Sequence, residues 1–154
     1  MTNAGIKYQT KTASTEEIRL HLKECNENFI PPLDQKVNLH EYSKKIFEKA
    51  ITFEAWADKT LVGMVAAYFN DIENLSGYIT SVSVDKNYTG KGVAHELMKS
   101  CIEYARKNNF LQIKLEVAEG NLKAIQLYKK FDFAAIEMKD TMVKMKLTIN
   151  NSNS

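Results

Sequence analysis

The sequence has few of the residues that small proteins use as cross-links or metal ligands. It contains two cysteines, Cys25 and Cys101, which stand far apart and form no CxxC pair. Both fall in helical patterns, where a cysteine packs as a small core or surface residue. We therefore expect neither a disulfide framework nor a bound metal.

Long apolar runs and a large net charge are also missing. No run approaches the ~20 residues of a membrane-spanning helix, and the first residues, Met1 to Gly5, lack the apolar centre of a signal peptide. The net charge of +2 is too small to favour nucleic acid or a membrane as a partner. These absences predict a cytoplasmic protein without either kind of partner.

What is present is the composition of one globular domain. The 154 residues are 44% hydrophobic and 26% charged, as in ordinary soluble domains. A chain of this length buries roughly 70% of the surface that its unfolded form exposes, so its core needs no cross-links. We expect a single domain over residues 1–149 and a polar, disordered tail over residues 150–154.

The spacing of apolar residues predicts the element order βααβββαβαββ. Strands are expected near 6–12, 51–57, 61–69, 78–84, 112–117, 133–138 and 141–147, and helices near 14–28, from 38, from 94 to about 107, and at 122–131. Ser14 and Glu17 have the spacing of a capping box, and Asn38 and Asn121 are candidate helix caps. The pattern indicates an α+β layered domain, a mixed and mostly antiparallel sheet with helices on both faces.

Residues 29–37 form an irregular connection, because Pro31 and Pro32 stop any helix. This segment either lines a pocket or is a loop held to the core by Phe29 and Leu33.

The stretch from Asn87 to Ala94 leads from a strand into a helix through Gly90 and Gly92. Glycine lets the backbone approach a ligand closely because no Cβ intervenes. The first amides of a helix have no intrahelical partner, and its N-terminus carries roughly half a positive charge. The stretch can therefore cradle an anion, most simply a diphosphate; an ordinary strand-to-helix turn is the alternative.

Two motifs in this part of the chain are similar to those of a known family. One is Asn87-x-x-Gly90-x-Gly92, where the family has Q/R-x-x-G-x-G/A; the other is an asparagine, a helix and a tyrosine, from Asn121 to Tyr128. In this order they resemble the GNAT superfamily of acetyl-CoA-dependent N-acetyltransferases, most strongly over residues 61–133. Asn87 and Thr89 depart from the usual side chains, but such departures leave the backbone amides in place.

The resemblance implies a site for acetyl-CoA as co-substrate. The pyrophosphate would lie on the backbone from Thr89 to Ala94, and the pantetheine arm would add to a strand edge. The cofactor-binding residues implied are Val82, Ser83, Val84, Thr89, Gly90, Lys91, Gly92, Val93, Ala94, Asn121, Ala124 and Tyr128. A β-bulge near Val82 or Ser83 would free an N–H for the thioester oxygen, a role worth about 3 kcal/mol.

Tyr128 is the catalytic residue that the resemblance implies. A phenol with a pKa of about 10 stays protonated at pH 7 and can donate to the departing thiolate. Spacing alone would also suit a core aromatic; the place of Tyr128 in the signature after Asn121 favours the general acid.

No general base is apparent. The strand at 77–84 holds no carboxylate, and we expect the other candidates to be solvated surface or turn residues: Glu54, Asp71, Glu73 and Glu116. The three histidines, His21, His40 and His95, lie in helical patterns and are also expected at the surface, with His95 near the anion cradle.

The function implied is transfer of acetyl from acetyl-CoA to a primary amine on a small molecule, such as an amino sugar, a polyamine or an amino acid, by a monomer or homodimer. A protein N-terminal or lysine acetyltransferase would prefer an open groove, which segment 29–37 could close. A non-catalytic acetyl-CoA sensor is favoured by the missing base and opposed by Tyr128. The side chains expected to select the acceptor lie in segment 29–37 and around Trp56, Tyr68 and Asn70.

Overall fold

The structure, a computed structural model, describes residues 5–149; the expected tail at 150–154 lies outside the described residues. Its strands are β1 (Ile6–Thr10), β2 (Ile51–Ala57), β3 (Thr60–Asp71), β4 (Ser76–Val84), β5 (Gln112–Ala118), β6 (Ala134–Lys139) and β7 (Met142–Thr148). Its α-helices are α1 (Thr15–Glu24), α2 (Leu39–Lys49), α3 (Val93–Lys107) and α4 (Leu122–Lys130), and its 3₁₀ turns are η1 (Asn26–Asn28), η2 (Leu33–Gln35) and η3 (Lys86–Tyr88). The predicted order of strands and α-helices is confirmed.

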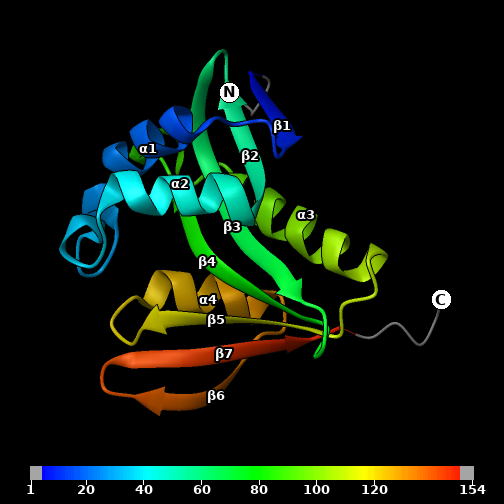
Figure 1. Ribbon diagram of the computed structural model, residues 1–154. Helices are drawn as coiled ribbons and strands as arrows, with labels where there is room; N and C mark the ends of the chain where they lie inside the picture. The colour runs from blue at the N-terminus through cyan, green and yellow to red at the C-terminus, as the bar shows by residue number, and fades with distance from the viewer. Residues whose placement is uncertain (1–4, 150–154) are drawn as a thin grey trace.

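One mixed sheet with the strand order β1-β2-β3-β4-β5-β7-β6 forms the middle layer (Figure 1). Successive side chains of a strand point to opposite faces, and β3 shows this division. Met64 and Ala66 pack in the core beneath α1 and α2, whereas Val65 and Ala67 pack in the core shared with α3 and α4. Helices therefore cover both faces, as the sequence predicts.

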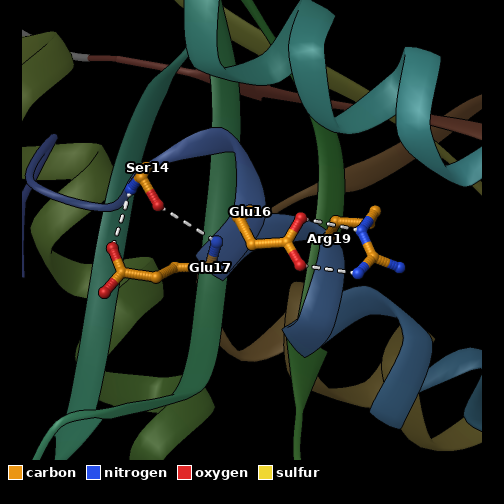
Figure 2. A network of polar contacts seen from close by, with 4 residues as sticks. All are labelled: Ser14, Glu16, Glu17 and Arg19. Atoms are coloured by element: carbon orange, nitrogen blue, oxygen red, sulfur yellow. Dashed lines mark hydrogen bonds and ion pairs between the residues drawn. The ribbon is translucent and has the colours of Figure 1, made fainter.

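The ends of the helices follow the local capping signals. Ser14 and Glu17 form the predicted capping box, with Glu17 N–H donating to Ser14 Oγ at 3.1 Å and Ser14 N–H donating to Glu17 Oε1 at 2.9 Å (Figure 2). On the exposed side of the same turn, Arg19 forms an ion pair with Glu16 at 2.6 Å (Figure 2). Asn38 and Asn121 also cap their helices, accepting from the amides of Glu41 and Ala124 at 3.0 and 3.3 Å.

Glu54 on β2 is fully buried, so the expectation of a solvated residue is wrong. Its carboxylate accepts hydrogen bonds from the amides of Thr12 and Ala13 at 3.0 and 3.1 Å. It also accepts from Trp56 Nε1 at 3.0 Å and from the hydroxyls of Thr12 and Thr52. Because its oxygens have this many donors, the carboxylate can be buried, and it fixes the loop that leads into α1.

The strands β4 and β5 run parallel and separate after a short ladder. They pair from Ser76 with Gln112 to Ile79 with Leu115, and beyond this point both strands continue without pairing to each other (Figure 1). A β-bulge lies at the same level, because Ala66 pairs with Ser81 while Ala67 pairs with Ile79. The bulge is thus at Thr80, slightly before the position expected near Val82 or Ser83.

Candidate active site

A cavity of about 340 Å³ opens where β4 and β5 separate. Its wall includes β4 from Tyr78 to Val84, β5 from Leu115 to Ala118, Asn121 with Ala124, Leu127 and Tyr128 of α4, and most of the segment from Asn28 to Val37. Six of the predicted cofactor residues therefore share one cavity: Val82, Ser83, Val84, Asn121, Ala124 and Tyr128. The predicted cradle from Thr89 to Ala94 lies outside its wall.

The glycine turn before α3 has the backbone that an anion cradle needs. Gly90 and Gly92 have φ values of 76° and 80°, in the left-handed region that side chains rarely adopt. Residues 89–92 are exposed, and a Cβ at either glycine would meet no atom within 4 Å. Gly92 is the N-cap of α3 and offers no side chain to the first amides of the helix, so these amides can donate to an external anion.

Tyr128 is both a core residue and part of the cavity wall. Its side chain is 6% exposed, and its ring lies 6.0 Å from that of Phe133. Burial raises the pKa of Tyr128 to about 12. The phenol therefore keeps its proton at neutral pH and is available as a proton donor.

The carboxylate candidates lie in different surroundings. Among residues 5–149, Glu116 is the one carboxylate in the cavity wall, and it is exposed. Asp71 accepts from the amide of Asn74 at 3.2 Å in the turn after β3, as expected of a turn residue. Within the described chain no cluster of three or more His, Cys, Asp or Glu residues is arranged to hold a metal.

His21 corrects the expectation that the histidines lie at the surface. It is 3% exposed, with Nδ1 3.1 Å from the carbonyl oxygen of Leu61 and Nε2 2.8 Å from Ser83 Oγ. Burial lowers the pKa of His21 to about 4, against smaller opposing effects of Leu61, Asp85 and Ser83. The missed signal is the helical spacing, which places His21 on the same face as the buried Ile18.

The other histidine near the predicted cradle is exposed, as expected. The ring of His95 lies 4.8 Å from that of Phe131, which follows α4. His95 thus bridges the start of α3 and the end of α4.

Segment 29–37 lines one end of the cavity and is also held to the core. Leu33 is 6% exposed and belongs to both the cavity wall and the core under α1 and α2. Tyr42 of α2 reaches the same end, where its hydroxyl lies 2.8 Å from the carbonyl oxygen of Thr80 and 2.7 Å from the Thr80 hydroxyl. By contrast, Trp56, Tyr68 and Asn70, expected near the acceptor, are not in the wall.

The sequence pattern of the Acetyltransferase (GNAT) family matches residues 15–133. The chain therefore belongs to this family of acetyltransferases. Within residues 5–149, no helix combines the length and the apolar character needed to cross a bilayer.

Relatives of known description match a central part of the chain. Streptothricin acetyltransferase A of Bacillus subtilis is 38% identical over 72 residues, 46% of this chain and 41% of the relative. N-acetylaspartate synthetase of Xenopus tropicalis is 36% identical over 73 residues, 47% of this chain and 27% of the relative. The match thus spans less than half the length of these curated relatives.

The fold is shared over almost the whole chain with solved structures. PaiA N-acetyltransferase from Thermoplasma acidophilum, solved in complex with coenzyme A, aligns with a TM-score of 0.74 at 14% identity, covering 93% of this chain and 99% of that one. At this identity the likeness shows the fold alone.

Proposed function

We propose that this protein transfers the acetyl group of acetyl-CoA to a primary amine on a small molecule. The observation that carries the proposal is the buried Tyr128 phenol in the wall of a cavity that opens between two separated strands. The acting unit is one domain over residues 1–149, working as a monomer or homodimer.

The residues present fit acetyl-CoA. The backbone amides from Thr89 to Ala94 would hold the pyrophosphate, and the edge from Val82 to Val84 would hydrogen-bond the pantetheine arm as an added strand. Asn121 and Ala124 would complete the cofactor site. When bound, acetyl-CoA supplies the activated acetyl group as a thioester.

The chain's own residues then act at the two ends of the displacement. As the amine nitrogen bonds to the acetyl carbon and the carbon–sulfur bond breaks, the hydroxyl of Tyr128 donates its proton to the sulfur. Its raised pKa keeps the phenol protonated at neutral pH, so the proton is present when the sulfur leaves. Glu116, at the exposed part of the cavity wall, can accept the proton that the amine loses, through water.

The shape of the cavity supports a small acceptor. Segment 29–37 and Tyr42 line the cavity, and their side chains would limit the room for an extended peptide. Streptothricin and aspartate, the acceptors implied by the names of the two relatives, are small molecules.

A thiol-release assay with acetyl-CoA and a panel of amines tests this proposal. The panel contains spermidine, D-glucosamine, L-aspartate and a peptide that begins with alanine. We expect turnover of at least one small amine, and a Tyr128→Phe variant should lose roughly 10²–10⁴-fold in kcat with little change in cofactor affinity. Tyr104→Phe is the matched control, because Tyr104 lies on α3 outside the cavity wall.

Three results would count against the proposal. Absence of heat on titration with coenzyme A would refute the proposed cofactor site. Preference for the peptide would favour a protein acetyltransferase, and an unchanged rate in Tyr128→Phe would leave Tyr128 a core residue only.

A further inference from the structure

A chain of hydrogen bonds runs from β3 through α1 to the cavity wall. The carbonyl oxygen of Leu61 lies 3.1 Å from His21 Nδ1, and His21 Nε2 lies 2.8 Å from Ser83 Oγ. A carbonyl can only accept, so Nδ1 must carry the ring proton. A neutral imidazole has one ring proton, and Nε2 is therefore the acceptor for the proton of the Ser83 hydroxyl.

This arrangement fixes the hydrogen-bonding character of Ser83. A serine hydroxyl has one proton and two lone pairs, and here the proton is already donated to His21. Toward any other group Ser83 Oγ is an acceptor only.

We propose that Ser83 Oγ is the acceptor for an N–H of the substrate amine, and that His21 is the residue that positions it. This inference rests on the proposed function and adds to it a subsite for the reacting nitrogen. A primary amine keeps at least two N–H groups whether it is charged or neutral, so it can donate to Ser83 while its lone pair forms the new bond.

The side of the sheet on which Ser83 lies assigns it to the amine rather than to the cofactor. Ser83 pairs with Met64, whose side chain packs beneath α1 and α2, and its partner His21 comes from α1. Tyr128 comes from α4 and packs in the core on the other face. Ser83, which would accept from the amine, and Tyr128, which would donate to the thiolate, are thus on opposite faces of the sheet, with the separated strands between them.

Burial of His21 keeps the hydrogen bond between His21 and Ser83 in this direction at neutral pH. A charged imidazole would donate from both nitrogens and would release the Ser83 proton toward the cavity. The pKa of His21, lowered by burial to about 4, keeps the ring neutral under ordinary conditions. Ser83 therefore stays an acceptor whether or not a ligand is present.

The first test compares Ser83→Ala with Ser83→Thr, which keeps the hydroxyl. Ser43→Ala is the matched control, because it removes a buried serine hydroxyl that has no partner and lies outside the cavity wall. With the fastest amine of the panel, Ser83→Ala should raise the amine KM by about 10-fold. The acetyl-CoA affinity should stay unchanged, and the Thr and Ser43 variants should keep the original KM.

The second test addresses His21 as a positioning residue. His21→Gln offers an amide oxygen that can accept the Ser83 proton, whereas His21→Leu offers no acceptor. We expect His21→Leu to raise the amine KM as Ser83→Ala does, and His21→Gln to restore it. A merely structural role would lower stability in both variants without separating their KM values, and that result would overturn the positioning role.

The ¹⁵N spectrum of the imidazole provides a readout that needs no turnover. In protein saturated with coenzyme A, spermidine, D-glucosamine and L-aspartate are each added. We expect a neutral His21 ring with its proton on Nδ1, and an Nε2 signal that moves with at least one amine but not in Ser83→Ala. A charged ring, an unmoved signal with every amine, or a Ser83→Ala effect confined to acetyl-CoA affinity would overturn the inference. Absence of turnover in the unaltered protein would instead defeat the proposed function, and the spectrum would still decide on the subsite.

Discussion

The burial of His21 predicts that the protein loses stability in mild acid. In the unfolded chain His21 has an ordinary pKa of 6.5, whereas burial lowers the pKa to about 4 in the folded protein. Between these values the unfolded chain binds a proton that the folded chain does not, so the free energy of unfolding falls as the pH falls. The difference corresponds to roughly 3 kcal/mol, lost between pH 6.5 and pH 4.

Urea denaturation at several pH values, at constant ionic strength, measures this loss. Carboxylates titrate in the same range, so the comparison needs a protein that differs only at this position. His21→Gln cannot titrate and can still accept from Ser83. The original protein should lose roughly 3 kcal/mol more than this variant over the range. Parallel losses in the two proteins would show that His21 titrates alike when folded and unfolded, which would refute the burial argument.

Two further predictions concern residues away from the His21–Ser83 pair. Glu54→Ala leaves buried donors of Thr12, Ala13 and Trp56 without a partner. It should therefore lower the free energy of unfolding by about 3 kcal/mol or more in urea titrations. Glu48→Ala, at an exposed position, is the control, and equal effects of the two substitutions would contradict the role of Glu54. Gly92→Ala should weaken acetyl-CoA binding in calorimetry by about 10-fold or more, because the Cβ would stand at the amides that face the phosphate. Its cost in stability should be only about 1–2 kcal/mol, since the Cβ meets no protein atom. Gly120→Ala is the control, because a Cβ there also meets no atom within 4 Å and the residue has no positive φ; it should keep the affinity for acetyl-CoA. Unchanged acetyl-CoA binding in Gly92→Ala would refute the proposed anion cradle.

Features that depend on a few neighbouring residues could be predicted from the sequence. The capping box of Ser14 and Glu17 and the caps at Asn38 and Asn121 are all present, because each joins a side chain to an amide within the same turn. The element order follows in the same way from the spacing of apolar side chains. The mixed sheet with helices on both faces is confirmed as well.

Features that depend on residues far apart in the sequence could not be predicted from it. The sequence around Glu54 indicates a solvated carboxylate, but in the structure the loop at Thr12 donates to it. The sequence around His21 indicates a surface residue, but in the structure Leu61 and Ser83 contact its ring. The position of the bulge at Thr80 depends on register with β3. No periodicity within β4 could locate it.

The separation of β4 and β5 also bears on how such a protein can change its substrate. Past Ile79 the main chain of β4 has no strand beside it on the β5 side, and its polar groups there need partners from outside the sheet. A carrier that binds to main-chain groups is insensitive to most side-chain substitutions around it. At the proposed site the acceptor, in contrast, would meet the side chains of segment 29–37 and of Ser83, so the choice of amine could diverge while the carrier stays the same.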